Sequence, residues 1–519
     1  MKRMKTAAML LMATAIAMTG CSGGNDNGNG NGNGNGNGNG GNANTGSANG
    51  AQNSGGKELA NITVTYPMIN AAQKDMQLIE DAINKIAEAK IQTHVKLKPI
   101  SAGEWAQQLN LMFTSNEEMD LITVSGAAYS NMAAKGQLVP LNDLLDQHGE
   151  GIKTAIGDQY MTATKIKGET FAVPTVRDLA VSYGFSMVKS LTDKYSIDAS
   201  AIKTLDDFEQ VLRTVKEGEK TFAPLVPAVA GHSYFDEYVF YDKLGDGVGV
   251  LPNYDNNLQI VNLYDMPEYK DFLTRARRWY EDGLAMKDAA TNKTSTFELV
   301  KSGKAFGTFT ALKPGFAAQE KQSTGIDLSI VETMPAVATT SSVTSIMWGI
   351  PVNSKQHEKA MAFLNLMYTD KDIVNLFDWG IEGTHYVKVA GQDNVIKYPD
   401  GADPATLGYM NPLGYLFGNQ FLSYVLEGND PDIWTKMKAF NDGAKPSKAM
   451  GFVFDVTPVK TEFAAVSNVI KQYKLPLETG SVDPEKILPE FQGKLKSAGI
   501  DKIIAEKQKQ LDEWAQSAK

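Results

Sequence analysis

A regular alternation of strand-like and helix-like segments constrains the fold of this chain most strongly. Residues 62–66 alternate apolar and polar side chains with the period of a strand, and residues 94–100 and 120–124 give two further strands. Residues 76–86 carry apolar side chains at helical spacing, and a short helix is expected around residues 105–111. Strands that alternate with helices pair in parallel, so the sequence predicts an α/β fold.

The carboxyl ends of these strands are the expected ligand-facing positions, because ligands of open parallel sheets bind beyond those ends. Residues 66–70 follow the first strand and residues 125–129 follow the third. They supply Tyr66 and Tyr129 as candidate contacts. Asn70 is the expected N-cap of the next helix.

Later segments extend the same pattern. Thr204, with Asp207 three residues on, predicts the capped start of a helix. Residues 345–351 read as a strand that ends at a proline, and Ser354 is expected to cap the helix after it. A charged helix is expected over residues 504–514.

The first twenty residues have the features of an export signal. Lys2, Arg3 and Lys5 precede a mostly apolar run over residues 7–18, and a small residue and Cys21 follow. This arrangement resembles the lipobox of bacterial lipoproteins, although Leu is more usual than Met at the lipobox position that Met18 would fill. The resemblance implies a cleaved signal peptide over 1–20 and acyl chains such as palmitate on Cys21; a plain secretory signal with a chance cysteine is the alternative.

The single cysteine excludes an intramolecular disulfide and a cysteine-based zinc site. Residues 21–57 are dominated by Asn and Gly, and we expect them to be disordered. A flexible chain of about 35 residues spans roughly 30–35 Å, which suits a tether between a lipid anchor and a folded domain.

The remaining chain is large and acidic. Roughly 460 residues follow this linker, which predicts two or more lobes. The net charge of -10, which becomes more negative when the signal peptide is removed, argues against binding to nucleic acid. We expect no metal site and no cofactor, because the histidines have no metal-ligand spacing and no phosphate-binding or serine-hydrolase motif is present.

Several local stretches, in their order along the chain, resemble the extracellular solute-binding proteins of ABC importers (family 1). These stretches are residues 135–141, 167–174, 348–351 and 380–386. Residues 411–514 are similar to a C-terminal domain of unknown function found in a Gram-positive lipoprotein branch of that family.

The resemblance implies a type II-like fold of two α/β lobes joined by a hinge, with a helical C-terminal extension. Lobe 1 would comprise residues 58–175 and also 345–385, a return strand with its helices. Lobe 2 would comprise residues 176–344. Residues 386–519 would form a helical region that packs on the lobes.

The family implies a binding protein and no enzyme. It would be a monomer, held by its lipid at the extracellular face of a Gram-positive cell membrane, that delivers a solute to separate ABC permease subunits. Many relatives bind carbohydrates, and a sugar site needs aromatic faces with fixed donors and acceptors. The candidate ligand contacts are Tyr66, Tyr129, Arg177, Tyr183, Asp236, Tyr241, Trp348, Glu382 and Tyr386.

Three alternatives remain open at this stage. Any one of these aromatic residues could instead be packed in the core, and for Trp348 the two interpretations are nearly even. A surface glycosidase could use two carboxylates among Asp236, Glu237 and Glu382. The ligand could also be a peptide or another small solute.

Overall fold

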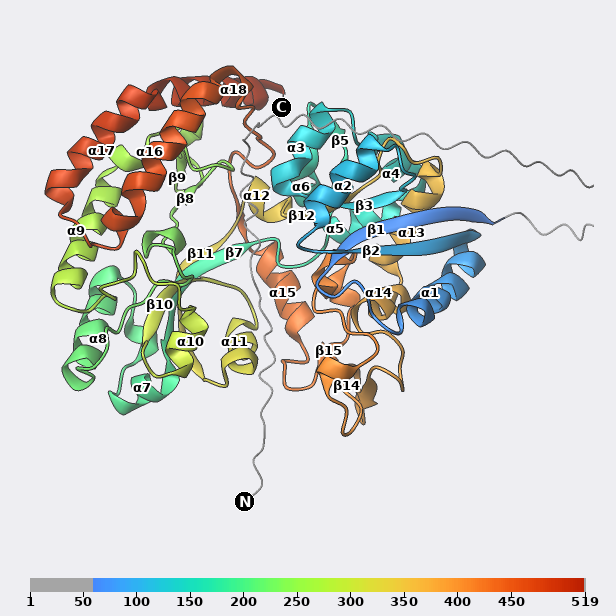
Figure 1. Cartoon of the computed structure of the whole chain (residues 1–519), viewed down its shortest axis with the longest axis horizontal. Helices are drawn as coiled ribbons and strands as arrows, with labels where there is room; N and C mark the ends of the chain where they lie inside the picture. Colours follow the sequence, from blue (N-terminus) through green and yellow to red (C-terminus); the bar gives the residue numbers. More distant parts are fainter. Residues whose placement is uncertain (1–58, 518–519) are drawn as a thin grey trace, which may run out of the picture.

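The computed structural model describes residues 59–517, which form two lobes (Figure 1). The predicted signal peptide, the predicted lipidation site Cys21 and all of the linker over residues 21–57 lie outside the described residues. Within residues 59–517, no helix combines the length and apolar character needed to cross a membrane.

Lobe 1 is built on a five-stranded sheet with the strand order β2-β1-β3-β12-β6. The pairs β1–β2 and β1–β3 are parallel, which confirms the predicted α/β start, whereas β12 is antiparallel to both β3 and β6. The strands are β1 (Ala60–Met68), β2 (Thr93–Ser101), β3 (Leu121–Ser125), β6 (Ala172–Pro174) and β12 (Ile346–Gly349).

Helices pack on this sheet through the apolar stripes seen in the sequence. In α1 the side chains of Ile79 and Ile83 are fully buried, as are those of Phe363 and Leu364 in α13. The helices of this lobe include α1 (Met76–Ile91), α2 (Trp105–Thr114), α3 (Gly126–Ala134), α13 (His357–Thr369) and α14 (Lys371–Asp378).

Two of the three predicted caps are wrong. Helix α1 begins six residues after Asn70, with Asp75 at its N-cap position. Ser354 does not cap α13, because Gln356 occupies the N-cap position of that helix. The Ser354 hydroxyl instead donates to Asp120 of lobe 1 at 2.6 Å. The third prediction is confirmed, because Thr204 and Asp207 form a capping box at the start of α8 (Leu205–Gly218).

Lobe 2 contains a four-stranded sheet with the order β10-β7-β11-β16. Strand β7 is antiparallel to both of its neighbours, and β16 is parallel to β11. Phe185 of β7 stacks on Phe208 of α8 with 3.8 Å between ring centroids. The strands are β7 (Val181–Val188), β10 (Gly307–Leu312), β11 (Leu328–Ala338) and β16 (Lys445–Pro446).

Three segments of the described chain connect the lobes. The first links β6 to β7, the second links β11 to β12, and the third runs through α15 (Ile433–Asp442) into β16. Figure 1 shows α15 between the two lobes. Two lobes joined by a few crossing segments have the architecture of a hinge.

The prediction of a helical region over residues 386–519 is wrong for its first part. The two parts of this C-terminal region pack on different lobes. Its first part forms a three-stranded sheet beside lobe 1, because residues 387–397 carry the β-branched pairs and turn glycine of a hairpin. Its second part forms three helices that share one core with α9 of lobe 2. The elements are β13 (Val387–Val389), β14 (Gln392–Lys397), β15 (Val425–Leu426), α16 (Lys460–Glu478), α17 (Pro484–Ala498), α18 (Ile500–Ser517) and α9 (Pro267–Glu281).

The close approach of β7 and β11 gives a prediction for stability. A Cβ atom on Gly184 would lie 1.9 Å from the carbonyl oxygen of Val331, so the Gly184→Ala variant must push two central strands apart. We expect it to lower the free energy of unfolding by about 1–3 kcal/mol or more, measured by thermal unfolding. Gly493→Ala is the matched control: no atom lies within 4 Å of its Cβ position in α17, and the change should stabilise the helix. Equal melting temperatures for Gly184→Ala and wild type would contradict this account.

Candidate functional site

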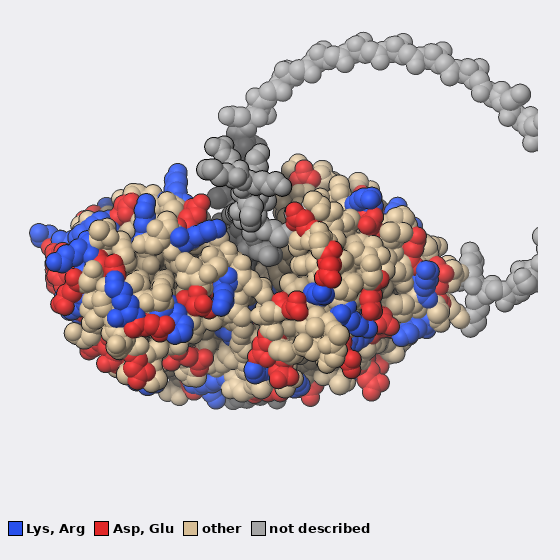
Figure 2. Space-filling model, turned by 90° about the horizontal axis from the view of Figure 1, so that it is seen from below, with Lys and Arg blue, Asp and Glu red and all other residues tan. Residues whose placement is uncertain are grey.

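The strand directions bring the carboxyl edge of the lobe 1 sheet and the carboxyl end of β10 in lobe 2 to the boundary between the lobes. Strand β6 leads directly into the first crossing, and β1, β2 and β3 run in the same direction as β6. In lobe 2, β7 starts at that crossing and β10 is antiparallel to it, so β10 ends there. The loops that follow these strands therefore face each other, and Figure 2 shows a hollow between the two lobes.

On lobe 1, the loop after β1 and the start of α3 form this edge. Ile69, the first residue after β1, is 57% exposed, which is unusual for a large apolar side chain. Gly126 opens α3, and a Cβ atom there would lie 2.7 Å from the carbonyl oxygen of Thr344 in the second crossing. The turn between β3 and α3 is thus packed tightly against the hinge.

Charged side chains gather at the first crossing. Asp178 accepts hydrogen bonds from Arg177 beside it and from Lys313, which follows β10 of lobe 2, the latter at 2.8 Å. The Arg177 guanidinium lies 5.1 Å from the ring centroid of Tyr415 on lobe 1. Burial alone would raise the pKa of Asp178, but Arg177 and Lys313 outweigh it and lower that pKa to about 2. The cluster therefore links both lobes through one ionised carboxylate.

Asn441, near the end of α15, fixes the backbone under this cluster. Its side-chain oxygen accepts a hydrogen bond from the Leu179 N–H at 3.0 Å, and its amide nitrogen donates to the carbonyl of Arg177 at 2.6 Å. The Tyr160 hydroxyl donates to the Asn441 carbonyl at 2.5 Å. The third crossing therefore holds the first in place, which preorganises the charged side chains above it.

In lobe 2, residues 227–233 form a loop that runs toward the boundary. Leu225 bridges Gly307 in parallel at the start of β10, so the chain here advances in the same direction as β10. Val229 is 48% exposed, whereas Ser233 at the end of the loop is buried. The tip of the loop at Val229 is thus exposed, whereas its root at Ser233 is buried.

Aromatic rings that are half-buried surround the same boundary. Ile433 of α15 touches lobe 2, because a Cβ atom on Gly315 would lie 2.8 Å from its Cδ1 atom. The Trp434 ring beside it stacks on Phe421 with 6.0 Å between centroids, and the ring edge donates to a backbone carbonyl at 2.8 Å. Rings held in this way can present a face to the C–H patch of a sugar. The half-buried aromatic residues here are Tyr183, Phe316, Tyr415, Phe421 and Trp434.

The structure gives a packing role to five of the aromatic candidates. Trp348 is fully buried, and its indole N–H donates to the carbonyl of Leu416 at 2.5 Å. Tyr66 is also fully buried and packs edge-on against Phe417 with 5.0 Å between centroids. The buried candidates are Tyr66, Tyr129, Tyr241, Trp348 and Tyr386.

The Tyr129 hydroxyl is satisfied within lobe 1. It donates to the carbonyl of Thr164 at 2.6 Å and accepts from the N–H of Phe171 at 2.9 Å. Burial raises the pKa of Tyr129 to about 12. Tyr129 therefore fixes the segment before β6, and its hydroxyl already donates and accepts a hydrogen bond within lobe 1.

Two of the three carboxylates that a glycosidase could use form ion pairs with separate cations. Glu382 forms an ion pair with Lys388 at 3.2 Å on the lobe 1 side, and Asp236 pairs with Lys474 of α16 on lobe 2. Of the predicted contacts, the structure thus places Arg177 and Tyr183 at the boundary. Glu382 lies apart, and Asp236 lies under the loop of residues 227–233.

His385 has an ordinary hydrogen-bonding role. Its Nδ1 atom accepts from the N–H of Ile381 at 2.9 Å, so its Nε2 atom carries the proton and donates to Asp75 at 3.2 Å. Within residues 59–517, no group of three or more His, Cys, Asp or Glu side chains is arranged to hold a metal ion.

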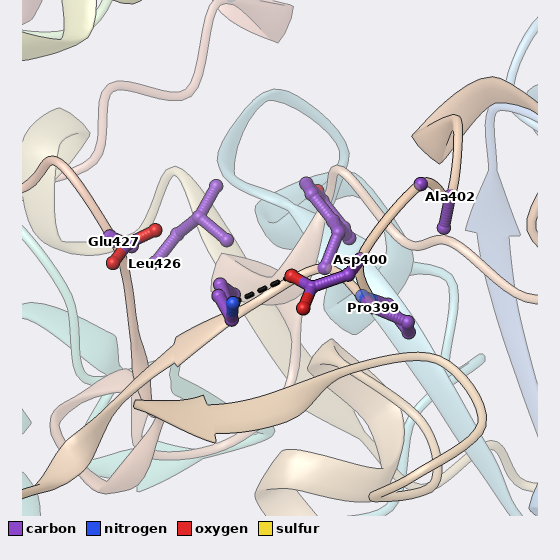
Figure 3. A pocket seen from close by; sticks show the side chains of 8 residues that line it. Pro399, Asp400, Ala402, Leu426 and Glu427 are labelled. Atoms are coloured by element: carbon purple, nitrogen blue, oxygen red, sulfur yellow. Dashed lines mark hydrogen bonds and ion pairs between the residues drawn. The ribbon is translucent and has the colours of Figure 1, made fainter. Parts of the chain in front are cut away.

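A pocket on lobe 1 is separate from the boundary (Figure 3). Its lining comes only from residues 397–402 and 426–427, next to β14 and β15, so lobe 2 contributes nothing to it. Lys397 and Asp400 form an ion pair of 2.7 Å across it.

The partners that complete the inter-lobe cluster are not apparent from the sequence alone. Lys313, Phe316, Tyr415 and Trp434 come from segments in which the sequence offers no candidate ligand contact. A signal for the first two is present in the alternating run of residues 307–312 and the Pro-Gly turn after it.

Comparison with known proteins identifies the family. A model of the bacterial extracellular solute-binding proteins matches residues 70–373, more than half of the chain. The chain belongs to this family. A domain of unknown function, DUF3502, matches residues 448–516. These two matches confirm the resemblance found in the sequence.

Two binding proteins of ABC transporters have sequences similar to that of this chain. The chain is 28% identical over 481 residues to a carbohydrate ABC transporter substrate-binding protein of Streptococcus pneumoniae, covering 92% of this chain and 94% of that protein. A fructooligosaccharide ABC transporter substrate-binding protein of the same organism, FusA, is 24% identical over 239 residues, covering 40% of this chain and 42% of that protein. The family and these relatives are binding proteins and not enzymes.

The N-glycan transport solute-binding protein NgtS of S. pneumoniae has a similar structure. One NgtS structure gives a TM-score of 0.78 at 26% identity and covers 89% of this chain and 100% of NgtS. The complex of NgtS with Man1GlcNAc gives 0.66 at 26% identity, covering 87% and 99%. This similarity confirms the predicted two-lobed α/β fold.

The charged cluster predicts an acid-dependent loss of stability. Because the pKa of Asp178 is lowered to about 2, its contribution is present above its ordinary pKa of 3.8 and is lost as the pH falls toward 2. We expect Asp178→Asn to remove about 2 kcal/mol at pH 7 and to flatten the acid side of the stability curve. The control is Asp146→Asn, which breaks an exposed pair with Lys153. Identical acid profiles for wild type and Asp178→Asn would contradict the assignment.

Buried Glu478 of α16 predicts an opposite trend nearer neutrality. Burial raises its pKa from 4.5 to about 7, Lys474 opposes the rise and Asp236 adds to it. A raised carboxyl pKa contributes stability that is complete below about pH 4.5 and is lost as the pH rises through 7. Melting temperatures between pH 5 and pH 8 should therefore fall less for Glu478→Gln than for wild type. Some slope should remain, because burial also raises the pKa of Glu237 to about 7.

Proposed function

We propose that this protein binds an oligosaccharide between its lobes and delivers it to the permease of an ABC importer. The observation that carries the proposal is the inter-lobe arrangement of one ionised carboxylate, two cations and partly exposed aromatic rings. The carbohydrate transporter relative supports it over nearly the whole chain, and the NgtS complexes with Man1GlcNAc and Man5GlcNAc support a glycan as the ligand.

The chemistry of the cluster suits a neutral polyol. Asp178 can accept from sugar hydroxyls, while Arg177 and Lys313 can donate to them, and hydrogen bonds to charged groups are stronger than neutral ones. The ring of Tyr415 offers an apolar face next to these polar groups. We favour an oligosaccharide over a peptide or other small solute, because the carbohydrate transporter relative matches nearly the whole chain.

Binding would act on the hinge by population shift. A ligand that touches both lobes contacts all of its partners only in the closed form, and it stabilises that form by the difference in contacts. Two NgtS complexes with glycans resemble this structure less closely than the NgtS structure for which no glycan is named, with TM-scores of 0.66 and 0.65 against 0.78. This difference supports a change in the arrangement of the lobes on ligand binding.

The proposed anchor is compatible with an open site. We infer that acyl chains on Cys21 hold a monomer at the outer face of a Gram-positive cell membrane. The chain enters lobe 1 at Ala60, the start of β1, and the carboxyl edge at the boundary lies at the other end of that strand. A tether attached there would leave the inter-lobe hollow free for the solute and the permease subunits.

A binding screen tests the proposal. Man5GlcNAc, Man1GlcNAc, fructooligosaccharides and peptides would be added to the protein, with thermal unfolding as the readout. We expect one glycan class to stabilise it by about 2.7 kcal/mol at a hundredfold excess over Kd, and the glycan to be recovered intact by mass spectrometry.

The variant Lys313→Met should weaken glycan binding by about tenfold, because it removes a charged donor. Lys153→Met, on the surface of lobe 1, is the control and should bind as wild type does. Stabilisation by peptides alone would overturn the proposal, and so would shortened glycan products after incubation.

A further inference from the structure

The segment matched by DUF3502, residues 448–516, is an integral part of lobe 2. Leu477 of α16 and Phe491 and Leu495 of α17 have no exposed surface. They belong to the same apolar cluster as Tyr269 and Trp279 of α9. The segment is therefore packed into the core of the lobe and is not an appendage on its surface.

Two successive turns of α16 also make polar contacts with the turn at residues 233–236. Glu478 is completely buried and accepts a hydrogen bond from the Tyr269 hydroxyl at 3.0 Å, and it also bonds the Ser233 hydroxyl. Lys474, one turn earlier, pairs with Asp236. Asp236 in turn accepts from the N–H of Ser233 at 2.8 Å. Both ends of this turn are thus fixed by the C-terminal segment.

This turn is the root of the loop of residues 227–233. The other root is held by the Thr296 hydroxyl, which donates to the carbonyl of Pro227 at 2.6 Å. Between the roots, Val229 is 48% exposed, and the side chain of His232 is 46% exposed. The loop is therefore fixed at both roots, whereas its tip is exposed.

The hydrogen bonds of Ser233 at this root depend on a proton from Glu478. The Ser233 hydroxyl has one proton but lies within bonding distance of both Glu478 and Asp236, the latter at 3.1 Å. If Glu478 carries a proton and donates it to Ser233, the serine can donate to Asp236, and each group is satisfied. Removal of the Glu478 carboxyl group would leave the buried Tyr269 hydroxyl without its acceptor and would take one of its partners from Ser233.

We propose that α16 of the DUF3502 segment positions the loop of residues 227–233 in lobe 2: Glu478 and Lys474 fix residues 233–236 and thereby set the affinity of the inter-lobe site without touching the ligand. The part of this inference that concerns affinity rests on the proposed function; the part that concerns the loop does not. Glu478 and Lys474 are positioning residues in this account.

Hydrogen–deuterium exchange on the ligand-free protein tests the role in the loop. We expect peptides covering residues 227–238 to exchange about tenfold faster in Glu478→Ala than in wild type. Glu478→Gln should keep the wild-type protection, because its amide can donate to Ser233 and accept from Tyr269. Glu462→Ala is the matched control on the same helix, since Glu462 pairs with Lys502 and not with the loop.

Unchanged exchange of residues 227–238 in Glu478→Ala would overturn the inference. Equal acceleration over all of lobe 2, including β7 and β10, would also overturn it, because Glu478 would then have only a general role in stability.

Affinity measurements separate this inference from the proposed function. With Man5GlcNAc as the probe, calorimetry should give a Kd about tenfold weaker for Glu478→Ala, with Glu478→Gln and Glu462→Ala close to wild type. Equal Kd values for Glu478→Ala and wild type would refute the positioning role while leaving the glycan assignment intact. If wild type binds no glycan, the proposed function fails, and the exchange experiment still decides whether α16 holds the loop.

Discussion

The direction in which the strands meet the hinge is the constraint on which the rest of the structure depends. Strands β6 and β7 are consecutive, and the first crossing joins the carboxyl end of one to the amino end of the other. Because the remaining strands are paired parallel or antiparallel to these two, the loops beyond β1, β3 and β10 face a common boundary. The charged cluster around Asp178 occupies that boundary and joins side chains from both lobes.

The C-terminal region divides its contribution between the lobes. Helix α15 fixes the first crossing through Asn441, and α16 fixes a lobe 2 loop through buried Glu478. A family domain of unknown function thereby becomes part of the lobe core and of the support for the site. Buried polar networks of this kind specify one arrangement only when every member is satisfied.

The sequence predicts the parts of the fold that depend on local periodicity. Strand β1, helix α1 and the capping box at Thr204 follow from neighbours a few residues apart. The site depends on distant pairs, which single-sequence patterns do not reveal. Ser233 and Glu478 are 245 residues apart in the chain, and Asp178 and Lys313 are 135 apart. The sequence makes Trp348 a candidate for ligand stacking. In the structure its N–H donates in the core to the carbonyl of Leu416, 68 residues away.

Small-angle X-ray scattering of the protein during a Man5GlcNAc titration tests the central claim of hinge closure most directly. The account predicts that the radius of gyration falls as the site fills, to a plateau at saturation, and that dialysis of the glycan restores the original value. A saturated complex whose radius of gyration equals that of the free protein would contradict a site formed by the approach of two lobes.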